Sequence, residues 1–302
     1  MTVMGGALLG TLSLTMPLLL AALGETVVQR SGVVNVGLEG MMLTGAFAAF
    51  VGTVLSVYLP GHPPGTAANP YFGLLVAIVA GMLMALLFAF FVVRLAANQV
   101  VVGVVVNLLA LGLTGTLLRI LPRTDGSFLN TQALPQIFYN QTILTPLALL
   151  AVPGVWWWLF RTRRGLELRA CGEQPVAAEA SGIPVMRRRT IAILFGGAMA
   201  GLAGAFLSVG DVPTFQEGMS AGRGFIALAI VTSGRWNPWG CLIAALVFGF
   251  TDRLQIQGQA IGLHVPHDLL LALPYIATLL ILTFGYGWSL APAALGRPYR
   301  RT

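Results

Sequence analysis

The polar side chains of this chain suit binding and positioning, and none is arranged for covalent chemistry. The sequence holds no paired carboxylates, and His264 and His267 lack metal-ligand spacing. All 17 basic residues are Arg. A Walker A loop and a Schiff base both need a Lys, so the sequence excludes a standard P-loop ATPase and an amine nucleophile. We therefore expect no catalytic residue, no metal site and no enzymatic activity in this chain.

The first polar interruption, residues 24–40, holds Glu25, Arg30, Asn35 and Glu39 among glycines and leads into an apolar run. Two interpretations are equally supported. The segment is a discontinuous helix of the kind that builds substrate sites in transporters. Alternatively, it is an ordinary inner loop before a helix whose N-terminus lies near Glu39, where a carboxylate suits the helix dipole.

The second interruption consists of Asn98, Gln99 and Asn107, at the start of the apolar run over residues 100–121. Asn98 and Gln99 either cap that helix or contact a ligand. Asn107 lies deeper in the helix and must find a partner, and we favour a hydrogen bond between helices over a ligand contact.

The third interruption, residues 210–224, is polar and rich in Gly, and it precedes a short apolar piece. We favour a loop on the outer face, with a gate or substrate funnel as the alternative. The residues predicted to line a transport pathway across these three interruptions are Asn35, Glu39, Asn98, Gln99, Asn107, Phe215, Glu217 and Arg223.

The composition is that of a membrane protein. Of the 302 residues 57% are hydrophobic and only 9% are charged, whereas soluble domains carry roughly 25% charged residues. Apolar runs of about 20 residues are long enough to span a bilayer as helices. Spans are predicted over residues 3–23, 41–59, 71–93, 100–121, 143–160, 191–209 and, slightly shorter, 269–285.

Two further apolar pieces, residues 225–233 and 241–250, are too short to span alone. We therefore predict one all-α polytopic domain over residues 1–302. It has eight to ten transmembrane helices, some of them broken or re-entrant. Within residues 191–209, Gly197 and Gly201 form a G-x-x-x-G pair that predicts close helix packing.

The charged loop at residues 161–189 holds seven of the 17 arginines and three of the ten acidic residues. Cytoplasmic loops collect basic residues, so we place this loop inside. If the spans alternate, 13 of the 17 arginines then lie on the same side, which requires the N-terminus outside and the C-terminus inside. Because the arginines follow membrane topology, the net charge of +7 does not indicate nucleic-acid binding.

Within this loop we predict a short helix over residues 173–182. Pro175 suits the first helical position, and Gly182 suits the residue just past the end. The residues between them are mostly Val and Ala, with Glu179. A short helix that is anchored between two spans can act as a mechanical coupler, and a disordered loop is the weaker alternative.

These segments resemble the permease subunits of bacterial ABC importers, in the branch that serves nucleosides, simple sugars and branched-chain amino acids. The similarity extends over residues 23–285. It is carried by RSGVVNVGLEGMMLTGA (30–46), NQVVVGVVVNLLALGLTG (98–115), GLELRACGEQPVAAEASGIPVMRRR (165–189) and GMSAGRGFIALAIVTSGRWNPWG (218–240). At the position of residues 35–39, which are NVGLE in this chain, sugar-type members of the family have the motif D-L-S-x-G. Members that transport branched-chain amino acids have the motif N-F-x-H-G-E there. The resemblance therefore favours nucleosides, and the Ser233 of SGRW is a small departure from the family's FGRW.

The resemblance implies that a separate cytoplasmic ATPase, which binds ATP and Mg, moves this chain through the loop, so that the chain itself needs no cofactor. It also implies a second homologous permease as a heterodimeric partner and an extracytoplasmic binding lipoprotein that delivers a small polar substrate. The location implied is the bacterial inner membrane. The residues that carry over as the coupling segment are Glu173, Pro175, Ala178, Glu179, Ala180, Gly182 and Ile183.

Other functions remain as alternatives. The same kind of permease could serve simple sugars or branched-chain amino acids. An ion-coupled secondary transporter would need an acidic residue or a His deep in a span, and the sequence shows none that is clearly central. A membrane-embedded enzyme would need a clustered catalytic set, which the sequence lacks.

Overall fold

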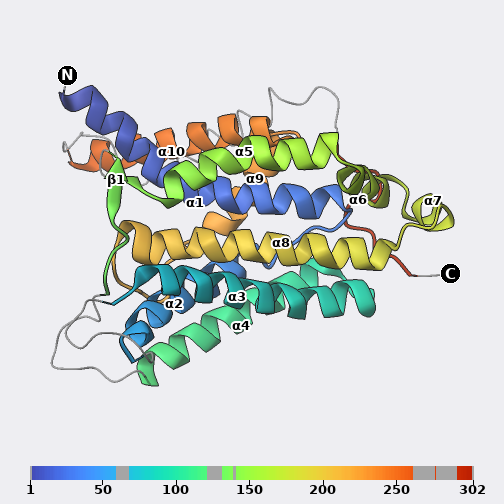
Figure 1. The fold of residues 1–302 in the computed structure, drawn as a ribbon, viewed down its shortest axis with the longest axis horizontal. Coiled ribbons are helices and arrows are strands. Elements are labelled where there is room, and N and C mark those ends of the chain that lie inside the picture. The colour runs from blue at the N-terminus through green and yellow to red at the C-terminus, as the bar shows by residue number, and fades with distance from the viewer. Residues whose placement is uncertain are drawn as a thin grey trace.

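The computed structural model describes residues 2–58, 68–120, 131–138, 141–260, 276 and 291–300, and it shows an all-α bundle (Figure 1). The helices are α1 (Thr2–Arg30), α2 (Leu38–Leu55), α3 (Pro70–Ala89), α4 (Gln99–Ile120), α5 (Leu144–Arg161), α6 (Arg163–Glu173), α7 (Pro175–Ala180), α8 (Val185–Ala205), α9 (Arg223–Ser233) and α10 (Pro238–Ala260). A 3₁₀ turn, η1 (Ser56–Tyr58), follows α2, and π-helical turns, η2 (Phe90–Arg94) and η3 (Phe206–Asp211), follow α3 and α8.

Seven of these helical segments are long and apolar enough to cross a membrane. They are Gly10–Arg30, Leu38–Tyr58, Pro70–Arg94, Gln99–Ile120, Leu144–Arg161, Val185–Asp211 and Pro238–Gly258. Six of them match predicted spans, which confirms a polytopic helical membrane protein. The predicted span at residues 269–285 lies outside the described residues, as do His264 and His267.

The prediction that residues 241–250 are too short to span was wrong. They belong to α10, which runs for 23 residues from Pro238 to Ala260. The apolar run breaks at Asp252 and Arg253, but the helix continues through these polar residues. By contrast, α9 has only 11 residues, which is about 16 Å of helix. The prediction that residues 225–233 are too short to span a bilayer is therefore confirmed.

Helices α1 and α8 lie side by side at the centre of the bundle (Figure 1). Helix α8 also packs on α2 and α3, while α1 also packs on α5, α9 and α10. Glycines make the α8 contacts close. A Cβ atom at Gly197 would collide with the carbonyl oxygen of Gly81, and one at Gly201 would collide with that of Ala77. The predicted role of these glycines in helix packing is thus confirmed.

A small hairpin of β1 (Gln136–Phe138) and β2 (Gln141–Thr142) was not predicted. The strands are antiparallel, and Gln136 lies opposite Thr142. Such short strands carry too little apolar alternation to be recognised in a sequence.

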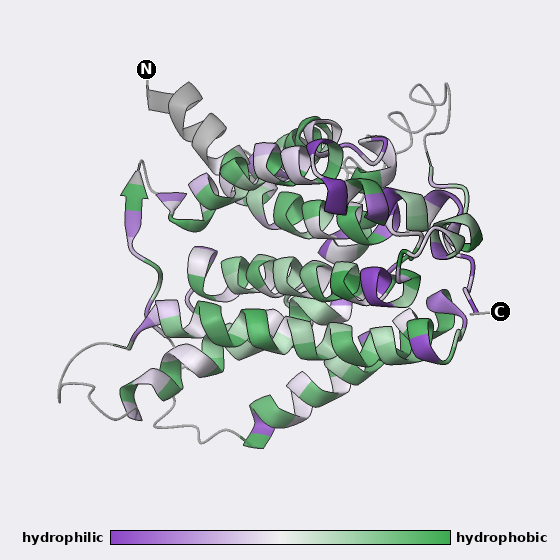
Figure 2. Cartoon of the chain, turned by 45° about the vertical axis from the view of Figure 1, so that its right-hand side comes forward, coloured by the Kyte–Doolittle hydropathy of each residue, from purple (hydrophilic) through white to green (hydrophobic). Residues whose placement is uncertain are grey.

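Several charged segments meet at one end of the bundle, which we call the Arg-rich end: α6, α7, the C-terminal turn of α1, the α9–α10 turn and residues 291–300 (Figures 1 and 2). Gly172 accepts a hydrogen bond from the Ala294 N–H at 2.9 Å, and Gly32 accepts one from the Gly296 N–H at 3.1 Å. Arg30 Nε donates to the Trp236 carbonyl at 3.0 Å. The grouping agrees with the arginine pattern, and the side of the membrane on which this end lies stays a prediction.

Candidate translocation and coupling site

The carboxylate of Glu39 joins two helix beginnings inside the bundle. Glu39 lies in the first turn of α2. Its two oxygens accept hydrogen bonds from the Gly222 N–H at 2.8 Å and the Gly224 N–H at 2.6 Å, at the start of α9. The first N–H groups of a helix have no partner within the helix and carry partial positive charge. One carboxylate therefore satisfies two of the N–H donors at the start of α9 and also sits favourably in the first turn of α2.

Two side chains of α4 hold the non-helical segment before α2, residues 31–37. Gln99 Oε1 accepts from the Val34 N–H at 2.7 Å. Asn107 Oδ1 accepts from the Gly40 N–H at 2.8 Å, and Asn107 Nδ2 donates to the Val36 carbonyl at 3.0 Å. Asn107 lies about 12 Å further along α4 than Gln99, so this segment and the Glu39 junction enter the bundle.

Residues 24–30 complete α1, and only residues 31–37 are non-helical before α2. A substrate site at this position stays a prediction. A helix does begin near Glu39, and the chain before it is a true break among packed helices. Gly103 is where the break approaches α4 most closely, because a Cβ there would collide with the main chain of Gly37 and Val36. Irregular backbone at such depth needs protein partners, which the side chains of α4 supply.

From the other side, the break is held by Glu25, a residue that the sequence analysis did not assign to the site. Glu25 is fully buried in α1, and its Oε1 accepts from the Asn35 N–H at 3.0 Å and from Gln29 Nε2 at 2.9 Å. Trp236 Nε1 donates to Gln29 Oε1 at 2.7 Å. The signal was present, as Glu25 and Gln29 are one turn apart on an apolar helix, but the partners come from distant parts of the chain.

Three buried polar atoms around the break have no hydrogen-bond partner among the described residues. They are Glu25 Oε2, Asn35 Oδ1 and Gln99 Nε2. Burying such an atom without a partner costs roughly 1–3 kcal/mol, and proteins use these groups where water or a bound polar group approaches. Around the break, these three atoms each keep an unused hydrogen-bonding position.

The remaining predicted pathway residues have different positions. Asn98 is exposed and caps α4, accepting from the Val100 and Val101 N–H groups at 2.9 and 3.2 Å. Phe215 is buried against Phe47, with ring centroids 5.2 Å apart. Arg223 turns back to the Met219 carbonyl at 3.2 Å. Phe215 lies in the segment that leads into α9, Arg223 is the first residue of α9, and Asn98 acts as the cap of α4.

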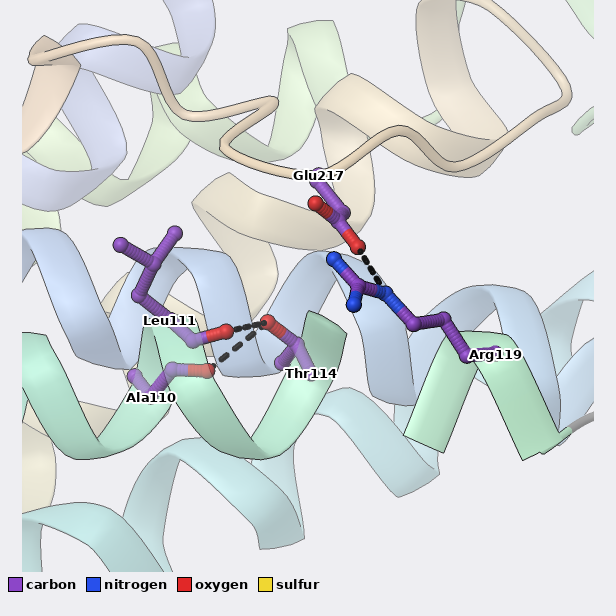
Figure 3. Close-up of polar contacts among 5 residues, drawn as sticks. All are labelled: Ala110, Leu111, Thr114, Arg119 and Glu217. Carbon is purple, nitrogen blue, oxygen red and sulfur yellow. Dashed lines mark hydrogen bonds and ion pairs between the residues drawn. The ribbon is translucent and has the colours of Figure 1, made fainter. Parts of the chain in front are cut away.

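Glu217 pairs with Arg119 near the end of α4 (Figure 3). The Arg119 Nε and Glu217 Oε1 atoms are 3.2 Å apart, and the side chains keep 73% and 46% of their surface exposed. One turn earlier, Thr114 donates to the Ala110 carbonyl at 2.8 Å (Figure 3). Because the Arg119–Glu217 pair is exposed, it links residues 212–222 to α4 only weakly.

At the Arg-rich end, the predicted coupling helix is present as α7. Pro175 occupies its first position, and Gly182 follows its end with φ +83°, a conformation that favours glycine. Ala178 is buried, while Val176 remains 65% exposed. The Tyr299 hydroxyl donates to the Glu179 carboxylate. A groove of about 680 Å³ runs between α7 and residues 293–299.

The sequence analysis missed α6, which fills the first part of the charged loop. Thr162 caps it by accepting from the Gly165 N–H at 3.1 Å. Burial raises the pKa of the Cys171 thiol near its end, so Cys171 acts as a small apolar group and not as a reactive thiolate. The sequence analysis treated this part only as a charged loop, because a capping residue such as Thr162 is a weak signal for a helix start.

Arg189 connects this end to the break. It is 3% exposed at the start of α8. Its guanidinium donates to the Ser31 carbonyl at 3.1 Å, to the Cys171 carbonyl at 3.4 Å and to the Arg297 carbonyl at 3.3 Å. One side chain thus ties together the break, α6 and the C-terminal residues. Its role could not be read from the sequence, where it is one of three consecutive arginines.

The seven candidate spans and the polar break among them define a multi-pass helical protein of the cell membrane. Residues 7–282 match the family described as branched-chain amino acid transport system / permease component. The chain belongs to this family, whose members are permease components of ABC importers and not catalytic enzymes. No solved structure gives a significant match.

Three relatives are similar over most of their length. The guanosine ABC transporter permease protein NupQ of Bacillus subtilis is 38% identical, over 96% of this chain and 94% of the relative. The putative glucose ABC transporter permease protein TsgC13 of Haloferax volcanii is 37% identical, over 87% and 80%. The nucleoside ABC transporter permease protein NupC of Lactococcus lactis is 34% identical, over 94% and 93%.

The Glu39 junction can be tested with Glu39→Gln. The amide keeps one acceptor oxygen but turns an NH₂ group toward the N–H groups of α9, so we expect a loss of about 1–3 kcal/mol in stability. Thermal unfolding in detergent should show a lower Tm, and hydrogen exchange should rise over residues 218–226. The matched control is Glu217→Gln, which breaks an exposed ion pair and should cost at most about 1 kcal/mol. If both variants lowered the Tm by the same small amount, the proposed importance of the Glu39 hydrogen bonds would be contradicted.

Proposed function

We propose that this chain is one permease subunit of an ATP-driven importer for nucleosides. The observation that carries this proposal is the similarity to NupQ and NupC over nearly the whole chain, together with an exposed α7 between two spans. The glucose-related TsgC13 has similar identity, so a simple-sugar importer is the second candidate. The Asn35-to-Glu39 form of the break favours nucleosides.

The pairing of the relatives supports a heterodimer. In Bacillus subtilis a second guanosine permease protein, NupP, is 29% identical to this chain, against 38% for NupQ. In Lactococcus lactis the values are 26% for NupB and 34% for NupC. The chain therefore resembles one type of each pair more than the other. A different, homologous permease is its expected partner.

The proposed coupling segment consists of Glu173, Pro175, Ala178, Glu179, Ala180, Gly182 and Ile183, within the cytoplasmic loop 161–189. The support is geometric. Helix α7 is short, exposes Val176, and is bordered by a groove. A cytoplasmic ATPase that holds ATP and Mg would dock here, so that this chain needs no cofactor of its own.

Movement of α7 would reach the break through Arg189 and through the contact of Gly172 with Gly32. A Cβ at Gly172 would collide with the Arg30 carbonyl, so α6 and the end of α1 touch main chain to main chain. Such close contacts leave little room for α6 to move without residues 31–37. We propose that this is how closure of the ATPase changes the pathway.

The proposed pathway follows the break and the start of α9. Asn35 and Gln99 offer unpaired polar atoms, while Glu39, Asn107 and Arg223 shape the main chain beside them. Phe215 and Glu217 lie in the segment that precedes α9, and Asn98 contributes only as a helix cap. An extracytoplasmic binding lipoprotein would deliver the small polar substrate to the opposite end of the bundle.

Uptake competition tests the substrate class. Cells that produce the complete importer are given labelled guanosine and an excess of unlabelled nucleosides, glucose, ribose or leucine. We expect nucleosides to suppress uptake and the other three compounds to leave it unchanged. Suppression by glucose or ribose would replace the nucleoside proposal with the sugar candidate.

The coupling role of α7 is tested with Val176→Asp. Since Val176 is exposed, the variant should fold, but an unpaired charge buried against the ATPase is costly. We expect the stimulation of ATPase activity by substrate-loaded binding protein to fall by at least about tenfold. The control is Leu166→Asp on α6, an apolar residue that is 59% exposed and lies outside α7. Equal activity of the two variants would refute docking at α7.

A further inference from the structure

A cavity of about 330 Å³ lies near the Arg-rich end, between α1, α5, α6 and α8. Its size falls in the range of pockets that hold small organic ligands, roughly 300–1,000 Å³. Apolar side chains form most of its wall: Val27, Val155, Trp158, Leu168, Ile191, Ala192 and Phe195. None of the residues assigned to the pathway or to α7 contributes to it.

The cavity exists because the packing beneath α6 is incomplete. Val27, Val155, Leu168 and Ala192 belong to a small apolar cluster that is separate from the main core. Gly154 also lines the cavity, and a Cβ there would have no atom within 4 Å. On the outer rim, Ile191 and Phe195 remain 44% and 37% exposed. This rim belongs to the candidate span Val185–Asp211, so its exposed side chains would face lipid beside the cavity.

Two arginines stand at the polar edge of this otherwise apolar cavity. Arg164 is exposed at the start of α6, where the helix N-terminus adds partial positive charge. Arg188 forms an ion pair with Glu167. Its Nε is nevertheless buried without a hydrogen-bond partner among the described residues. Two arginines against the single carboxylate of Glu167 leave this edge with a net positive charge.

We propose that this cavity binds an anionic phospholipid, with one acyl chain between α5 and α8 and the headgroup phosphate at Arg164 and Arg188. The apolar wall suits the chain, and the planar guanidinium of Arg suits a phosphate. Basic pockets between transmembrane helices near one membrane face bind anionic headgroups. A zwitterionic headgroup fits less well, because its cationic part would face two arginines. This inference holds whatever substrate the chain transports.

Native mass spectrometry of the detergent-purified chain, titrated with phosphatidylglycerol or phosphatidylcholine, tests the proposal. We expect one phosphatidylglycerol to remain bound at concentrations at which phosphatidylcholine is lost. The double variant Arg164→Gln/Arg188→Gln should weaken this binding by about tenfold or more. The matched control is Arg163→Gln/Arg187→Gln, which removes the same charge from exposed neighbours that do not line the cavity, and it should bind as the unmodified chain does.

A second variant, Gly154→Leu, fills the cavity without touching the arginines. A Cβ at this position meets open space, and replacing a helix Gly should not lower the stability of the helix. We expect loss of the bound phosphatidylglycerol with no decrease in Tm. Equal retention of the two lipids, equal loss in the two double variants, or full retention in Gly154→Leu would each overturn the proposal.

Discussion

The hydrogen bonds from Gly222 and Gly224 to the Glu39 carboxylate are the contact on which the centre of this structure depends. A helix that starts inside a membrane exposes N–H groups that no water can satisfy cheaply. Helix α9 has only 11 residues and starts within the bundle, so its first turn needs an acceptor from elsewhere in the chain. Glu39 supplies that acceptor from the first turn of α2. The beginnings of α2 and α9 are thereby fixed against each other.

The same requirement explains the polar residues around residues 31–37. Main-chain N–H groups at or beside this segment donate hydrogen bonds to three side chains: Gln99 and Asn107 on α4 and Glu25 on α1. These side chains hold the break in place. The atoms that stay unpaired, on Asn35, Gln99 and Glu25, lie beside the proposed pathway. Structural support and the proposed pathway therefore use the same few residues.

Much of the fold could be predicted from local sequence patterns. Apolar runs gave six of the seven candidate spans, and the placement of Pro175 and Gly182 gave α7. The errors have physical causes. The polar residues of α10 shortened its apolar run, so its length was underestimated. Likewise, α6 lacked any strong start signal, and the β1–β2 hairpin was too short to be seen.

The site was only partly predictable because its contacts join residues far apart in the chain. The sequence indicated that Asn35, Glu39, Gln99 and Asn107 interrupt apolar segments, but not that Glu39 meets residues 222 and 224. Glu25 was noticed but not assigned to the site, although it is fully buried beside the break. Arg189 could not be distinguished from Arg187 and Arg188, since only its burial sets it apart. The sequence shows which polar residues interrupt apolar segments. Their hydrogen-bond partners cannot be read from it, because they depend on how the helices pack.

The central claim is that movement at α7 reaches the break through Arg189. The most direct test is the number of nucleoside molecules transported per ATP hydrolysed by the complete importer in vesicles, for the unmodified chain and Arg189→Gln. Both quantities come from the same complexes, so a loss of folded protein lowers them together and leaves the ratio unchanged. Our account predicts that ATP hydrolysis continues while the ratio falls by about tenfold or more, as expected when a buried, hydrogen-bonded charge is removed. A ratio equal to that of the unmodified chain would contradict it.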